Sequence, residues 1–307
     1  MRQARPSLRK AGRLAPARAG RLRHLLVFAV PGLAVYALFV LVPVVMTVYL
    51  SLTNQNAFNP PTRFIGLANY SRLLADESFL NALRNTAVIT VLVTAGANAC
   101  GLCIALLLER RGWLNNILRS VFFTPVVLSS VVVSVIWQAL LTDDGLLNSL
   151  LTELGVQQPP GWLSDPGIAL YSLSWIICWQ VLGFCVVVYL AALQGIPQEL
   201  HEAAGLDGAG PLERFRHVTW PMIAPAVTIN TIMLLITGFK VYDQVQVITN
   251  GGPGDGATST IAFEIVQTAF AGNRVGYASA MATVMLVLVA TISTVVLRAL
   301  QRREVSA

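Results

Sequence analysis

Lysine is almost absent from this chain, and charged residues of every kind are scarce. Only 12% of the 307 residues are charged, against 55% that are hydrophobic, and the mean hydropathy is +0.66. A soluble domain carries about twice that charged fraction. The shortage of charge argues against an ordinary soluble domain, and the recurring runs of roughly 20 apolar residues are each long enough to cross a bilayer as a helix.

The two lysines also exclude a phosphate-binding loop. A Walker motif needs a Gly-Lys pair, whose backbone amides and ammonium group hold the phosphates. Here Lys10 follows Arg9 and Lys240 follows Phe239. The glycine-rich stretch NGGPGDG at 250–256 is not followed by Gly-Lys, and it reads as a tight turn at the end of a span. The chain therefore cannot bind ATP in the P-loop manner.

Residues that hold metals or carry out catalysis are few and scattered. Cys100, Cys103, Cys178 and Cys185 all fall inside predicted spans, where neither zinc nor a redox partner would reach them. The three histidines are far apart in sequence, and no GxSxG or HExxH motif is present. We expect no catalytic residue, no metal and no cofactor, and hence no enzyme.

The apolar runs predict an all-α polytopic membrane protein with six transmembrane helices. We place these helices at about 25–50, 84–108, 120–141, 169–193, 223–248 and 277–297.

The positions of the basic residues predict the orientation, because positive charge stays on the cytoplasmic side. Most of the 21 basic residues fall in the N-terminal tail, in alternate loops and in the C-terminal tail. The loop residues are Arg110, Arg111, Arg119, Arg214 and Arg216, and the C-terminal ones are Arg298, Arg302 and Arg303. Both termini are expected in the cytoplasm. Lipid headgroups account for the net charge of +6, and nucleic acid is not needed as a partner.

The Arg-rich N-terminus has two other interpretations, a transit peptide and a cleaved signal peptide. The apolar run after residue 24 is too long for a signal peptide and lacks a clear cleavage site. An uncleaved first helix is favoured. The predicted organisation is an Arg-rich tail at 1–24, a six-helix domain at 25–297 with a polar loop at 194–222, and a C-terminal tail at 298–307.

The stretch EAAGLDGAGPLERFRHVTWP at 202–221 forms a polar elbow between two apolar runs. Pro197 and Pro211 favour the starts of two short helices, glycines at 205, 208 and 210 favour a bend between them, and Pro221 is expected to end the elbow. The pattern predicts a compact cytoplasmic knob, and the alternative is an ordinary charged loop.

The same stretch resembles the cytoplasmic signature of the permease subunits of binding-protein-dependent ABC importers. Glu202, Ala203, Ala204 and Gly208 match that signature with the correct spacing, nine residues separate Gly208 from Val218, and Pro221 closes it. Val218 and Trp220 replace the usual Ile and Leu. The segments 191–209 and 247–260 are similar to the carbohydrate branch of the family, and the second to the first permease of maltose and glycerol-phosphate systems.

The resemblance implies the type I importer transmembrane fold, a location in the bacterial inner membrane, and a set of partners. These are a second homologous permease in a heterodimer, two ATP-binding cassette subunits, an extracytoplasmic solute-binding protein and a carbohydrate. The knob would couple to the ATPase through Glu202, Ala203, Ala204, Asp207, Gly208 and Pro221.

Polar residues in the fifth predicted span suggest a substrate path. Asn230, Thr237 and Gln244 recur every seven residues, which places them on one helix face. Lys240 and Asp243 are three residues apart, so on a helix they would be adjacent and paired. The alternative for Lys240 and Asp243 is a polar contact between helices that does not touch a ligand. Tyr242 is expected either to stack on a sugar or to belong to the interfacial aromatic belt.

A different class of protein also fits the six spans, namely a channel or an ion-coupled carrier that works without ATP. A carrier typically has inverted repeats and several intramembrane carboxylates, whereas Asp243 is the one acid placed well inside a span. The sequence favours the permease.

Overall fold

The computed structural model describes residues 29–56, 58, 61–109 and 112–302. Regular structure in these residues is helical, and the one antiparallel pairing, between Thr53 and Phe64, is an isolated bridge outside any strand. The prediction of an all-α fold is confirmed. The Arg-rich segment 1–24, Arg110, Arg111 and Arg303 lie outside the described residues.

Five helices in the described part of the chain are long and apolar enough to cross a bilayer. They are Ala29–Ser51, Glu77–Leu108, Ser130–Glu153, Ala169–Gln194 and Val275–Gln301, of which Ser130–Glu153 is interrupted by a turn at 142–145. Pro211–Met222 and Ala224–Phe239 meet at a bend of 62° and form a sixth crossing if they are taken as one span. The chain is therefore a polytopic helical membrane protein.

The first helix, Ala29–Ser51, contains a π-helical segment, η1 (Ala37–Leu41), followed by α2 (Val42–Ser51). None of its most apolar 18-residue window is buried within the chain. Pro31 and Pro43 lie inside it, as membrane helices allow where the freed carbonyls find other partners. The compact unit to which this helix belongs ends at Tyr49, and a second unit begins at Leu50.

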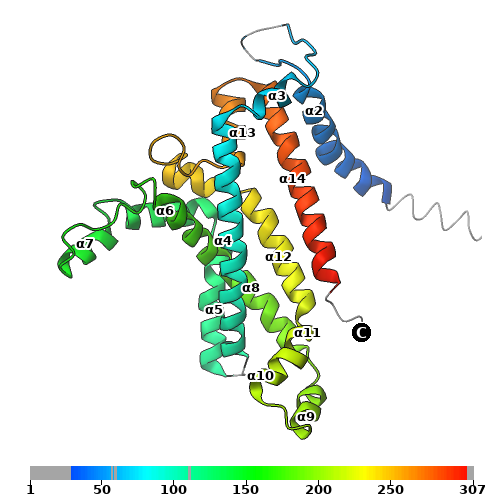
Figure 1. Cartoon of the computed structure of the whole chain (residues 1–307), viewed down its shortest axis with the longest axis vertical. Helices are drawn as coiled ribbons and strands as arrows, with labels where there is room; N and C mark the ends of the chain where they lie inside the picture. The colour runs from blue at the N-terminus through cyan, green and yellow to red at the C-terminus, as the bar shows by residue number, and fades with distance from the viewer. Residues whose placement is uncertain (1–28, 57, 59–60, 110–111, 303–307) are drawn as a thin grey trace, which may run out of the picture. The chain divides into compact units, whose positions relative to one another are not determined.

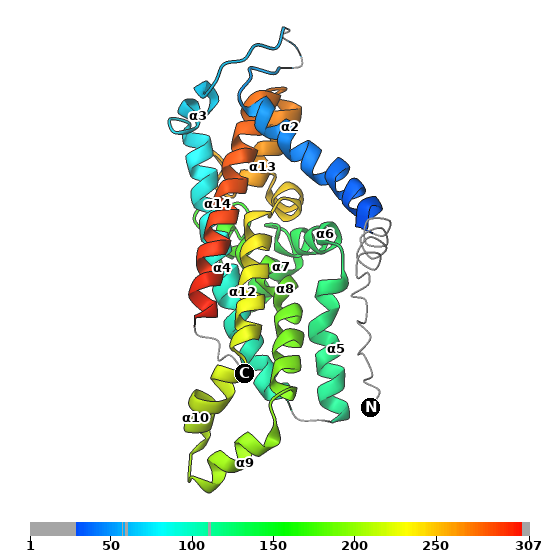
Figure 2. The same cartoon turned by 90° about the vertical axis from the view of Figure 1, so that its right-hand side faces the viewer.

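In the second unit, α4 (Glu77–Leu108), α8 (Ala169–Gln194) and α12 (Ala224–Phe239) pack side by side and form the core (Figures 1 and 2). Small residues allow close contact, as expected where lipid supplies no hydrophobic drive between helices. A Cβ added at Gly101 would collide with Cys185, and one added at Gly238 would collide with Thr90. The core therefore depends on backbone approach as well as on apolar side chains.

The second predicted span, 84–108, begins earlier than predicted. Asp76 caps α4, because its carboxylate accepts hydrogen bonds from the backbone N–H groups of Ser78 at 3.0 Å and Phe79 at 3.3 Å. The first turn of α4 is polar and is stabilised by this cap, so the helix starts before the apolar stretch from which the span was predicted.

The third predicted span, 120–141, is in fact two helices. α5 (Trp113–Val127) contains Pro125 and ends where Leu128 turns to an extended conformation, and α6 (Ser130–Leu141) begins two residues later. After a short turn, α7 (Leu146–Glu153) follows. α5 runs two residues past Pro125, and the apolar run is broken where Leu128 and Ser129 leave the helical conformation.

The fifth predicted span, 223–248, is also interrupted. α12 ends at Phe239, residues 240–242 are non-helical, and a π-helical segment, η3 (Val245–Thr249), follows. The turn at 250–256 is confirmed, with Asn250 and the glycines at 251, 252, 254 and 256 all at positive φ. The sequence missed the next helical stretch, which is α13 (Ile261–Val266) and η4 (Gln267–Ala271). The last helix, α14 (Val275–Gln301), agrees with its prediction.

The second unit has two distinct ends. α9 (Gln198–Leu206) and α10 (Pro211–Arg214) form a projection at one end, and α3 (Ala68–Leu73) and α13 lie toward the other (Figures 1 and 2). The break between α5 and α6 and the end of α12 lie between these ends (Figure 2).

Candidate functional site

The predicted knob exists and consists of α9, α10, η2 (Phe215–Thr219) and α11 (Trp220–Met222). The bend between α9 and α10 turns at Gly208, whose φ of +80° is in the left-handed region. A Cβ there would meet no atom within 4 Å, so the requirement for glycine comes from the backbone and not from crowding. Gly205, by contrast, lies within α9, and Gly210 precedes α10 at a φ of −70°.

Hydrogen bonds within the knob hold its shape. The Glu213 carboxylate accepts from the backbone N–H of Gly210 at 2.9 Å, and the Arg214 Nε donates to the carbonyl of Ala209 at 2.8 Å. Both bonds join the bend to the second helical segment. These bonds fix the bend relative to α10.

The surface of the knob combines apolar and acidic side chains. Leu206 is 90% exposed and Leu212 is 78% exposed. Glu202 and Asp207 are exposed too, as is Ala203, and Gln198 Nε2 donates to Glu202 Oε1 at 2.8 Å. The projecting end of the second unit thus presents two exposed leucines together with exposed carboxylates.

Pro221 does not end the knob. The helical path runs through it to Met222, and the 62° bend comes at Ile223, before α12 starts. Proline fits the first turn of a helical segment, where its missing N–H costs nothing, so Pro221 is compatible with α11.

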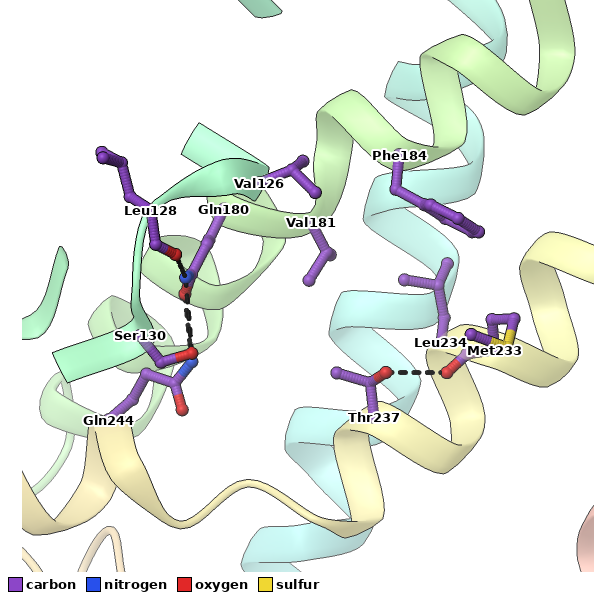
Figure 3. Close-up of a pocket in the computed structure, with 10 residues that line it drawn as sticks. All are labelled: Val126, Leu128, Ser130, Gln180, Val181, Phe184, Met233, Leu234, Thr237 and Gln244. Carbon is purple, nitrogen blue, oxygen red and sulfur yellow. Dashed lines mark hydrogen bonds between the residues drawn. The ribbon is translucent and has the colours of Figure 1, made fainter. Parts of the chain in front are cut away.

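A cavity of about 280 Å³ lies where the broken helices meet (Figure 3). It is lined by Val126, Leu128, Ser130, Gln180, Val181, Phe184, Met233, Leu234, Thr237 and Gln244. An adjoining cavity of about 370 Å³ shares Ser130, Met233, Thr237 and Gln244 and adds Ile236, Lys240, Val241, Tyr242 and Asp243. Together they are called the central cavity below.

One buried side chain, Gln180 of α8, ties the walls of the central cavity together. Its Nε2 lies 3.5 Å from the carbonyl oxygen of Leu128 and 3.4 Å from the Ser130 hydroxyl, and its Oε1 accepts from Gln244 Nε2 at 3.0 Å. Figure 3 shows Gln180 between the end of α5 and the start of α6. Amides and hydroxyls therefore stand among the apolar side chains of the central cavity, and the charged Lys240 and Asp243 lie in its adjoining part. A few polar groups among apolar walls are the usual composition of a small-molecule site.

Most of the predicted path residues line this cavity, and one does not. Thr237, Lys240, Tyr242, Asp243 and Gln244 are in its walls. Asn230 is fully buried and faces α8, where its Nδ2 donates to the carbonyl of Cys185 at 3.4 Å. The expectation that Asn230, Thr237 and Gln244 share one helix face was wrong, because α12 ends before Gln244.

The expected pair of Lys240 and Asp243 is not formed. Helical adjacency fails because Lys240 is the residue after the end of α12, and both side chains are exposed. Among the described residues neither side chain has an ion-pair partner. Tyr242 is half-buried instead, with its hydroxyl donating to Gln246 Oε1 at 3.2 Å and its ring tilted against Phe263.

The sequence analysis missed Ser130 and Gln180. Gln180 had a visible signal, because it is a lone amide in the middle of an apolar 26-residue helix. The sequence signal for Ser130 was weaker. No sequence signal pointed to the Leu128 carbonyl, because only the helix break exposes it.

Comparison with known proteins identifies the relatives of the chain. Residues 97–305 match the family described as "Binding-protein-dependent transport system inner membrane component". The "Probable ABC transporter permease protein YurN" of Bacillus subtilis is 37% identical, over 87% of this chain and 92% of that protein. The "Probable starch degradation products transport system permease protein AmyD" of Thermoanaerobacterium thermosulfurigenes is 34% identical, over 91% and 94%.

A solved structure shares the fold. A chain of the bacterial alginate ABC transporter, in complex with a periplasmic protein that holds an alginate pentasaccharide, superposes with a TM-score of 0.79. The alignment covers 91% of this chain and 94% of that one, at 20% sequence identity.

Proposed function

The chain belongs to the family of inner membrane components of binding-protein-dependent transport systems, and we propose from this premise that it is a permease subunit of an ATP-driven carbohydrate importer. The observation that carries the proposal is the preformed knob at one end of a helix bundle whose middle holds a cavity lined by amides and hydroxyls. A relative named for the transport of starch degradation products supports the choice of carbohydrate.

The knob couples the permease to a separate ATPase subunit in the cytoplasm. The chain has no phosphate loop, so ATP chemistry must come from another protein. Leu206 and Leu212 supply the apolar centre of the contact, and Glu202 and Asp207 supply an acidic rim that favours a basic groove. Because the knob is held by its own hydrogen bonds, a movement of the ATPase is transmitted to α8 and α12, which flank it.

The central cavity is one half of the translocation path, and a second, homologous permease supplies the other half. Carbohydrate hydroxyls exchange hydrogen bonds with Gln180, Gln244, Ser130 and Thr237, while Tyr242 and Phe184 offer apolar faces to the sugar ring. Lys240 and Asp243 stand at the wall without an ion pair, and their opposite charges leave the wall without net charge. The complete importer contains two permeases, two ATPase subunits and an extracytoplasmic binding protein, with both termini of this chain in the cytoplasm.

The first test reconstitutes transport. We expect labelled maltopentaose, cellopentaose or chitopentaose to enter liposomes that contain the complete assembly with ATP inside, and not liposomes that contain this chain alone. If the single chain moved sugar at the rate of the assembly, the chain would be an ATP-independent channel or carrier and the proposal would be wrong.

The second test addresses the knob. Leu206→Asp is expected to release the ATPase subunits during co-purification from membranes, because it places a charge in the apolar centre of the contact. Leu74→Asp is the matched control, since Leu74 is 78% exposed, against 90% for Leu206, but lies beside α3, at the opposite end of the second unit. Equal ATPase recovery in both variants would contradict the role of the knob.

A further inference from the structure

An aromatic cavity of about 520 Å³ lies between α6, α7 and the start of α8. Its walls include Trp137, Trp162, Tyr171 and Trp175. Trp137 meets Trp175 edge to face, with ring centroids 4.8 Å apart. Trp162 is fixed by a hydrogen bond from its Nε1 to Asn148 Oδ1 at 2.8 Å. The rings are therefore held in place before any ligand arrives.

Two of these aromatic side chains are open to the surroundings. Trp175 is 55% exposed and Tyr171 is 59% exposed. Within the described part of the chain, the indole N–H groups of Trp137 and Trp175 and the hydroxyls of Tyr171 and Ser172 have no hydrogen-bond partner. The cavity thus offers ring faces together with free polar groups at their edges.

Polar cavities continue from the aromatic one. Tyr171 also lines a cavity of about 300 Å³ with Asn81, Arg84 and Asn85. Asn81 in turn lines a third cavity, of about 560 Å³, with Glu77, Asp255, Ser259 and Glu264. The first two cavities share Tyr171 as a wall and the last two share Asn81, and the three together are called the terminal groove. It lies at the starts of α4 and α8, at the ends of these helices away from the knob.

The terminal groove is separate from the central cavity. On α8 it uses Leu170 to Trp175, whereas the central cavity uses Gln180 to Phe184, and the two have no lining residue in common. A ligand in the groove would therefore leave the central cavity free.

We propose that the terminal groove is a second carbohydrate site, which binds an oligosaccharide at the mouth of the importer. A pyranose ring has an apolar face of C–H groups and a rim of hydroxyls. Aromatic faces bind the first, and amides, a guanidinium and carboxylates bind the second. The groove presents these two kinds of surface in succession, with Trp175 and Tyr171 at one end, Asn81 and Arg84 in the middle, and the carboxylates at the other end.

A phospholipid is the competing ligand, with its acyl chain in the aromatic cavity and its phosphate at Arg84. Charge argues against it. Glu77, Asp255 and Glu264 line the cavity next to Arg84, and their carboxylates repel a phosphate. A neutral polyhydroxyl ligand meets no such repulsion.

This site rests on the proposed function, because it needs a carbohydrate substrate. It adds a separate expectation, which concerns the number of sugar units in the ligand. Because the three cavities follow one another through Tyr171 and Asn81, a longer sugar chain contacts more of their lining than a disaccharide does. We expect the groove to select oligosaccharides over their disaccharides.

The test uses equilibrium dialysis of the complete permease–ATPase complex, without binding protein, in nanodiscs. The probes are labelled maltopentaose, cellopentaose and chitopentaose and the three corresponding disaccharides. The background is Gln180→Ala, which perturbs the central cavity. We expect one pentasaccharide to bind in this background, about five-fold or more tightly than its disaccharide, and Trp175→Ala to weaken that binding by a similar factor. Trp175→Phe should retain it within about two-fold, because a ring face remains. Phe270→Ala is the control for removal of an exposed ring outside the groove.

Three results would overturn the site. The first is no pentasaccharide binding in the Gln180→Ala background, and the second is equal binding in Trp175→Ala and the parent. The third is quenching of tryptophan fluorescence by brominated phosphatidylglycerol that is lost in Trp175→Phe and that no pentasaccharide relieves. The last result would identify a lipid site. Failure of the proposed function is seen separately, as absence of sugar uptake by the unmodified assembly in liposomes.

Discussion

Gln244 donates a hydrogen bond of 3.0 Å to the side-chain oxygen of Gln180, although the two residues are 64 positions apart. Gln180 stands beside the break between α5 and α6, and Gln244 follows the break after α12. One pair of amides therefore joins two interrupted helices across the central cavity. Interrupted helices place free backbone groups inside the membrane region, which is tolerated where they line a cavity.

This contact predicts coupling between the two glutamines. Gln180→Leu and Gln244→Leu should each lower the midpoint of thermal unfolding of the assembled importer. The double variant should lose less stability than the two single variants lose together. The difference is a coupling energy of about 0.5–1.5 kcal/mol, as expected for a single buried hydrogen bond. The matched control pairs Gln244→Leu with Gln138→Leu, since Gln138 donates to the carbonyl of Ile248 and not to Gln244. Additive losses for Gln180 and Gln244 would contradict the contact.

Lys240 and Asp243 should behave independently. Because both side chains are exposed and form no ion pair, we expect Lys240→Met and Asp243→Asn to add in a double-mutant cycle of transport rate, within about 0.5 kcal/mol. A double variant that recovered activity lost in either single variant would show that the two charges pair during the transport cycle.

Gly208 should be required for coupling through its backbone conformation. Gly208→Ala is expected to cost about 1 kcal/mol in the native knob, since a residue with a Cβ resists a φ of +80°. Sugar-stimulated ATP hydrolysis by the assembly measures the effect, and Gly208→Asn should retain more activity than Gly208→Ala because asparagine tolerates this region better. The control is Gly210→Ala, at a φ of −70°. A loss in Gly210→Ala as large as that in Gly208→Ala would argue against a backbone cause.

Gly183 should be required for a different reason, which is close packing. A Cβ at this position of α8 would overlap the carbonyl of Phe122 on α5. Gly183→Ala must push α5 away from α8, at a cost of about 1–3 kcal/mol. Gly195→Ala, at the end of the same helix, would bring its Cβ no closer than 3.4 Å to another atom and serves as the control. Equal melting temperatures for the two purified variants would show that α5 does not pack this closely.

The sequence by itself determined the class of the fold and the position of the knob. In lipid, the backbone N–H and C=O groups of a long apolar run must hydrogen-bond to each other, and a helix allows this within one segment. The helical membrane fold therefore follows from composition. The knob could also be predicted, because Pro197, Gly208 and Pro211 act through their own backbones, and the match of Glu202, Ala203, Ala204 and Gly208 to a known signature needs no tertiary contact.

The tertiary structure alone decided where the long helices break and which polar groups meet at the breaks. Hydropathy cannot locate the end of α12, because residues on both sides of Lys240 are apolar, and it predicted a continuous helix with Asn230 and Gln244 on one face. The Leu128 carbonyl becomes available only when α5 ends, and Gln180 reaches it only because α8 packs against α5. The central cavity and the terminal groove are therefore properties of packing between distant segments, which the local pattern of a sequence does not encode.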